Sequence, residues 1–185
     1  MTILILGIVV FLGIHLLPTF PEVRTRFKKK LGENGYKVVF ALIALAGLIL
    51  IIDGMGNRDI LQVWEPPVYL SHLALVLMLP VFTLVAAAYI PCNMKRFTRH
   101  PMLWGVTLWA VAHLLANGDA GSILLFGGFL VYSLYDMWSA NKRGAEKSTK
   151  TWPLIYDIGV ATVGVLAYVL FFFLHPYIIG VNIIS

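Results

Sequence analysis

TILILGIVVFLGIHLLPTF (residues 2–20), followed closely by RTRFKKK (residues 24–30), decides the fold of this chain. The first stretch contains no Asp, Glu, Lys or Arg, and as a helix it is long enough to cross most of a hydrocarbon layer about 30 Å thick. The basic residues come after it, and no charged side chain precedes Glu22. A removable signal peptide carries positive charge before its apolar region. The order found here therefore predicts a retained transmembrane helix with its N-terminus outside.

The same alternation of apolar runs and short polar loops continues to the end of the chain. Five further runs lack charged side chains: 38–52, 68–90, 101–116, 120–135 and 158–179. Of all residues 59% are hydrophobic and 12% are charged, and the mean hydropathy is +0.85. Only backbone that is hydrogen-bonded internally is stable in hydrocarbon. We therefore predict an all-α polytopic bundle of six transmembrane helices, forming a single domain over residues 1–185, in which the short second run is extended by flanking residues.

The basic residues predict the direction of this bundle. Arg58 lies in the second loop, and the other 13 of the 14 basic residues lie in loops one, three and five. These are six residues within 24–37, three within 95–99 and four within 142–150. Basic loops stay in the cytoplasm, so both termini are expected on the periplasmic side of a bacterial inner membrane. The net charge of +5 is thereby explained by topology, and we expect no nucleic-acid partner.

Histidine is the residue type that carries candidate chemistry. His15, His72, His113 and His175 lie in apolar runs, where an ionisable side chain is costly and indicates a site. A neutral imidazole can bind iron or relay protons, although it can also simply join two helices by a hydrogen bond. His100 differs, because it stands at a helix start in a basic loop. No carboxylate lies inside these runs, which favours haem over a di-iron centre, and the lone Cys92 with no CxxCH motif excludes ordinary covalent haem attachment.

Two motifs in the second half of the chain resemble a known family. HPMLWG (100–105) and LWAVAHLLANGD (108–119) are similar to the NnrU membrane proteins, named for a link to denitrification, and more distantly to the zeta-carotene isomerase of plants and cyanobacteria. The resemblance extends over nearly the whole chain. It implies a non-covalently bound haem b with His15 and His113 as axial ligands and Trp109 beside them. The isomerases have a cysteine where Ala110 stands here, so the resemblance implies a haem-binding bundle and not a particular reaction.

Helix geometry suggests a second assignment of the ligands. At about 1.5 Å per residue, His113 and His15 differ in depth by about 10 Å within the predicted bundle. His72 and His175 lie closer in depth to His113. His72 is therefore the substitute ligand that geometry favours, and His175 stays open as another.

Two functions are consistent with these patterns. The first is a haem b protein that acts on a hydrophobic or gaseous small molecule, as an isomerase or oxidoreductase or in nitric oxide metabolism. The second is a non-enzymatic membrane component for assembly or regulation, in which the histidines only join helices. Membrane lipids are expected partners in both, and a membrane protein partner fits the second.

Overall fold

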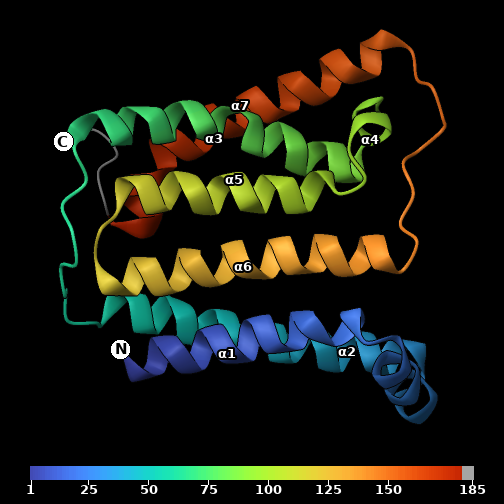
Figure 1. Cartoon of the computed structure of the whole chain (residues 1–185), viewed down its shortest axis with the longest axis horizontal. Helices are drawn as coiled ribbons and strands as arrows, with labels where there is room; N and C mark the ends of the chain where they lie inside the picture. Colours follow the sequence, from blue (N-terminus) through green and yellow to red (C-terminus); the bar gives the residue numbers. More distant parts are fainter. Residues whose placement is uncertain (181–185) are drawn as a thin grey trace.

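The computed structural model describes residues 1–180, and the predicted all-α class is confirmed there (Figure 1). The helices are α1 (Thr2–Leu16), α2 (Pro21–Gly56), α3 (Val68–Tyr89), the short α4 (Met94–Phe97), α5 (Pro101–Ala116), α6 (Ala120–Lys142) and α7 (Leu154–Ile179). A 3₁₀ turn, η1 (Leu17–Thr19), follows α1. The axes of the six longer helices lie roughly along one line, with the chain passing up and down between them. In space each helix packs against the next in the order α2, α1, α6, α5, α3 and α7.

Five of these helices, α1 (with η1), α2, α3, α6 and α7, are long and apolar enough to cross a membrane. The remaining long helix, α5, has 16 residues and a length of about 24 Å. It lies between α3 and α6 in the interior of the bundle, and residues of both its halves are buried. Short length is tolerated there because protein covers α5 on two sides. The count of six crossings and the outward termini stay predictions.

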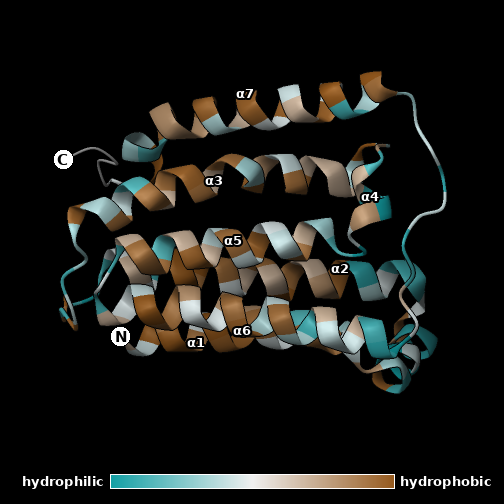
Figure 2. Cartoon of the chain, turned by 45° about the horizontal axis from the view of Figure 1, so that its top comes forward, coloured by the Kyte–Doolittle hydropathy of each residue, from teal (hydrophilic) through white to brown (hydrophobic). Residues whose placement is uncertain are grey.

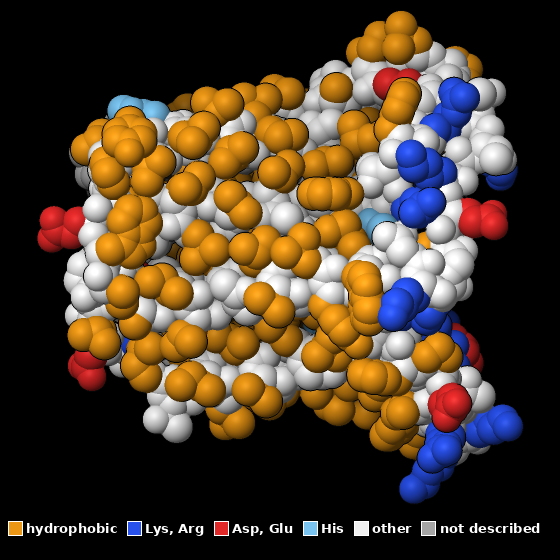
Figure 3. Space-filling view, in the orientation of Figure 1, with side chains coloured by type: hydrophobic (Ala, Val, Ile, Leu, Met, Phe, Trp, Pro, Cys, Tyr) orange, Lys and Arg blue, Asp and Glu red, His pale blue; other side chains and the backbone are white. Residues whose placement is uncertain are grey.

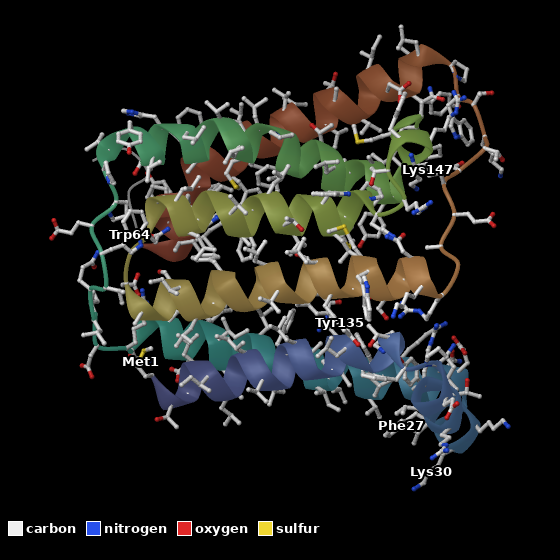
Figure 4. All side chains as sticks on the ribbon, in the orientation of Figure 1. Met1, Phe27, Lys30, Trp64, Tyr135 and Lys147 are labelled. Carbon is white, nitrogen blue, oxygen red and sulfur yellow. The ribbon has the colours of Figure 1, made fainter. Side chains whose placement is uncertain are left out.

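α2 differs from its predicted bounds, because it begins well before the uncharged run at 38–52. The helix includes the first basic segment and is interrupted at Gly32, which has φ 74° and ψ 167°. Glycine adopts this backbone conformation without the steric cost of a Cβ atom. The part after the kink, 33–56, is about 36 Å long, so the second crossing is not short. The part before the kink turns away from the bundle, as Phe27 and Lys30 show in Figure 4.

The surface has the pattern of a protein embedded in lipid. Hydrophobic side chains cover the length of the helices, while Lys and Arg gather at one end (Figure 3), and the hydropathy colours show the same division (Figure 2). Many large apolar residues are exposed, among them Leu42, Val76 and Leu166, each 60% or more. A soluble monomer rarely exposes so much contiguous apolar surface. Together with the apolar helices, this makes the chain a membrane protein.

Small residues set the position of α1 against α2. A Cβ atom on Gly7 would lie 2.6 Å from the backbone nitrogen of Ile51, and one on Gly47 would lie 2.7 Å from that of Phe11. Close helix contact through small residues is the usual way in which helices associate in membranes. This contact holds Phe11, and with it the end of α1, against the bundle.

Candidate functional site

His113 lies near the C-terminal end of α5 in aromatic surroundings. Its Nδ1 is 2.8 Å from the carbonyl oxygen of Trp109, and its ring stacks on Phe126 with centroids 4.4 Å apart. The Trp109 ring lies 5.1 Å away. The hydrogen bond to a carbonyl requires the proton on Nδ1, which leaves the lone pair on Nε2. This is the orientation of a metal-ligating histidine, in which one ring nitrogen donates a hydrogen bond and the other nitrogen binds the metal.

His15 has the same arrangement near the C-terminal end of α1. Its Nδ1 is 2.6 Å from the carbonyl oxygen of Phe11, and its ring stacks on the ring of Phe11 at 4.3 Å. The rings of Phe40 of α2 and Tyr132 of α6 face it edge-on, with their centroids 5.2 and 6.2 Å from that of the imidazole. Here too the lone pair is on Nε2.

Aromatic side chains fill the space between these two histidines. Phe129 of α6 contacts Phe11 at 5.6 Å and Trp109 at 5.3 Å, so rings connect the two sites continuously. The neighbours of His113 and His15 on α6 are Phe126 and Tyr132, which are six residues and therefore about 9 Å apart along that helix. This offset agrees with the depth difference of about 10 Å obtained from the sequence. The structure does not bring His15 and His113 together.

The other histidines separate into three environments. His72 is exposed on α3 and is not directed into the bundle. His175 of α7 is partly buried. His100 lies at the opposite end, where its Nε2 is 3.0 Å from Asn141 Oδ1. Within residues 1–180, no group of three or more His, Cys, Asp or Glu could hold a metal ion.

The surroundings of His113 fit the role of a single axial ligand of haem b. The imidazole is oriented by a carbonyl, its neighbours are apolar, and no carboxylate is needed. His15 lies about 9 Å from His113 along the bundle, with the ring of Phe129 between them, so the structure does not place these two imidazoles beside each other.

No thiol lies beside His113 in the described part of the chain. Ala110 is 0% exposed and packs with Leu4 and Phe126 in the core between α1, α5 and α6, so this position beside the site carries only a methyl group. Cys92 is buried in a separate cluster with Ala87 and Val160. The side chains near His113 therefore offer imidazole nitrogen and no sulfur.

A polar clamp, formed by Asp119 and Arg58 at the end of the bundle opposite the basic end, was not predicted from the sequence. Asp119 caps α6 by accepting a hydrogen bond from Ser122 N at 3.1 Å, and it forms an ion pair with Arg58 of 2.9 Å. Both side chains are mostly buried, with 12% and 15% exposed. Burial by itself would raise the pKa of Asp119, but the hydrogen bonds from Ser122 and Arg58 outweigh it and hold the pKa below its ordinary value. The available signal was Arg58, the single basic residue predicted outside.

The clamp also ties the loop after α2 across the outer end of α5. The carbonyl of Gly118 accepts hydrogen bonds from Val63 N at 2.9 Å and Trp64 N at 3.2 Å, and Ala120 N donates to the carbonyl of Leu61 at 2.9 Å. Gly118 has no room for a side chain beside Trp64. The turn after His113 is therefore held by three backbone hydrogen bonds, which closes the outer end of the site.

Fold and site together define a helical membrane protein with oriented histidines in an apolar interior. The chain belongs to the NnrU family, whose model, described as NnrU protein, matches residues 3–183. It is similar to the chloroplastic 15-cis-zeta-carotene isomerase of Zea mays, with 24% identity over 161 residues, which is 76% of this chain and 43% of that protein. The isomerase of the same name from Arabidopsis thaliana is 25% identical over 140 residues, 65% of this chain and 38% of that protein.

This chain spans less than half the length of these two curated relatives. No solved structure matches it.

Proposed function

We propose that this chain is a haem b-binding protein of the bacterial inner membrane, with both termini in the periplasm, that acts on a hydrophobic small molecule. The observation that carries the proposal is the imidazole of His113, which is oriented through Nδ1 and surrounded by aromatic rings. Haem b, when bound, supplies a redox-active iron. His113 would hold it, with His15 as the second ligand by family resemblance, or with the partly buried His175 of α7 in its place.

The residues around His113 have distinct parts in this proposal. The carbonyl of Trp109 keeps the proton on Nδ1, and Phe126 fixes the ring plane. Phe129 and Trp109 exclude water from the interior between α5 and α6. The hydrogen bonds of Gly118 close the end nearest the periplasm. An apolar substrate would then reach the site from the lipid and not from water.

The substrate class follows from the named relatives. Both are 15-cis-zeta-carotene isomerases, so we propose a cis polyene as the substrate and isomerisation as the reaction. Ala110 means that this chain would do so without a thiolate at that position. A gaseous ligand such as nitric oxide is the second candidate within the same haem site, and the family resemblance supports it.

Visible absorption of the purified protein tests the cofactor. We expect a Soret band that shifts on reduction with dithionite, and we expect His113→Ala to remove it. His72→Ala is the control, because His72 is exposed to the outside of α3. His15→Ala and His175→Ala then identify the second ligand. A colourless preparation from haem-replete cells refutes the proposal and favours the non-enzymatic component; loss of the band in His72→Ala refutes the ligand assignment.

The activity needs a separate measurement. Membranes containing the wild-type protein are incubated with 15-cis-zeta-carotene, and the isomers are separated by liquid chromatography. We expect conversion with the wild type and none with His113→Ala. A protein that binds haem but gives no conversion under reducing and oxidising conditions would contradict the substrate class and retain the cofactor.

A further inference from the structure

A pocket lies at the inner end of the bundle, remote from His113. Its volume is about 440 Å³, and its walls come from the end of α3, the start of α5, Lys95 of α4 and the loop after α6. These segments are far apart in the sequence and meet only in the folded chain. The basic end of the molecule in Figure 3 is the end that carries this pocket.

Three cationic side chains line the pocket, and they come from two different loops. Lys95 and Arg99 precede α5, and Lys147 follows α6. His100 adds an imidazole, and Glu146 is the acidic residue of the lining. The lining therefore carries an excess of positive charge, which suits a ligand with a negatively charged oxygen group.

Hydrogen bonds to neighbouring residues hold part of this lining in place. Asn141 Oδ1 accepts from Arg99 Nη1 at 3.2 Å and lies 3.0 Å from His100 Nε2, so one amide oxygen positions two of the lining residues. Ser148 N donates to the carbonyl of Lys95 at 3.0 Å and joins the two loops directly. The basic residues of the two segments are thus brought to one place by the fold.

The lining also contains apolar side chains. Ala88, Pro101 and Leu103 contribute to it, and Tyr89, 72% exposed, stands where α3 ends. On α6, Lys142 lies over the ring of Trp138 at 4.0 Å, a pairing of aromatic and basic residues typical of the headgroup level. A pocket lined by both cationic and apolar side chains at this depth matches a molecule that has a phosphate and an attached acyl chain.

We propose that this pocket binds the phosphate group of an anionic lipid from the inner leaflet. Lys95, Arg99 and Lys147 contact the phosphate oxygens, and the glycerol and acyl portions lie along Ala88 and Leu103. Basic pockets between transmembrane helices on the cytoplasmic side are known to select anionic headgroups. The proposal is independent of haem, because no residue of the pocket belongs to the site around His113.

Native mass spectrometry of the full chain in detergent tests this with two matched variants. The pocket variant is Arg99→Gln/Lys147→Gln. The control is Arg96→Gln/Lys150→Gln, which removes the same charge from the same two segments, three residues away in each, at positions that are exposed and outside the pocket lining. Each protein is titrated with phosphatidylglycerol and with phosphatidylcholine of identical acyl chains.

We expect the wild type and the control to prefer phosphatidylglycerol, and the pocket variant to bind it about 30-fold more weakly. Phosphatidylcholine, which has no net charge, should bind more weakly than phosphatidylglycerol to the wild type and to the control, and the pocket variant should lose most of this preference. Equal losses in both variants would overturn the proposal, because only general attraction by positive charge would remain. So would phosphatidylglycerol binding that is displaced by millimolar inorganic phosphate, which would identify a site for soluble phosphate.

Discussion

Replacing Asp119 with alanine should destabilise the fold, because this side chain both caps α6 and pairs with Arg58. Asp119 caps α6 through Ser122 N, and removal of an N-cap side chain costs about 1 kcal/mol. The substitution also leaves Arg58 without its carboxylate, which costs about 3–5 kcal/mol where a pair is fully buried. The two side chains keep 12% and 15% exposure, and Arg58 retains its bond to the carbonyl of Met55, so we reduce the second term to about 1–2 kcal/mol. The expected total is about 2–3 kcal/mol.

Unfolding by SDS in mixed micelles, followed by tryptophan fluorescence, measures this loss. Arg58→Met alone should leave the N-cap intact and cost less than Asp119→Ala. The double variant should cost less than the sum of the single ones by about 1 kcal/mol, because the pair can be lost only once.

Asp53→Ala is the matched control for this measurement. Asp53 accepts a hydrogen bond of 2.7 Å from Asn57 at the same outer end, but both residues are exposed. Exposed polar contacts contribute little, so the control should stay within about 0.5 kcal/mol of the wild type. Equal costs for Asp119→Ala and Asp53→Ala would refute the reasoning, as would a double variant whose cost is strictly additive.

Three further expectations concern acid stability, helix packing and topology. The pKa of Asp119 in the folded protein is held below its ordinary value of 3.8, so the ionised side chain contributes fully to stability above pH 3.8. This contribution is lost as pH falls from 3.8 through the folded-state pKa. Below pH 3.8 the wild type should therefore lose its advantage in melting temperature over Asp119→Asn. Gly47→Ala should lower the melting temperature, because the added Cβ meets Phe11 at 2.7 Å, and Gly13→Ala should not, because its Cβ meets nothing within 4 Å. Asp59→Cys should react with an impermeant maleimide in intact cells, and Lys29→Cys only after lysis.

Each of these has an outcome that contradicts it. If the melting temperatures of the wild type and of Asp119→Asn fall in parallel as pH is lowered, the ion pair does not stabilise the fold. Equal melting temperatures for Gly47→Ala and Gly13→Ala would contradict the close contact of α1 with α2. Labelling of Lys29→Cys before lysis would reverse the predicted orientation. The native Cys92 is 2% exposed and gives the low background that the labelling requires.

The class of fold could be predicted from the sequence because it depends on the hydrophobicity of each segment taken by itself. A run without charged residues is apolar in every arrangement, and only helices satisfy its backbone in lipid. The basic residues predict a direction in the same way, since the bias acts loop by loop, and this direction stays a prediction. Those patterns predicted a helical membrane bundle with its basic loops at one end, and the positions of Lys30 and Lys147 agree with the common end (Figure 4). The kink at Gly32 and the early start of α2 were not visible, because basic residues are as compatible with helix as with loop.

The site was accessible only in part. Residue type and apolar context indicated His15, His72, His113 and His175 as candidates, and helix arithmetic obtained the depth offset of His15 from His113 that α6 shows. The face on which each histidine lies was beyond the sequence. In a membrane the side of a helix toward lipid is as apolar as the side toward protein, so no periodicity distinguishes the exposed His72 from the partly buried His175. Only packing decides that rotation.

The sequence alone determined a basic-ended helical membrane protein with imidazoles in its apolar segments, because hydrophobicity and charge act locally along the chain. The tertiary structure decided which side chains meet: His113 with Phe126, Arg58 with Asp119, and Lys147 with the segment before α5. Each of these contacts joins residues from different helices or loops. Their relative depth and rotation are set by side-chain packing between helices, which no local pattern encodes.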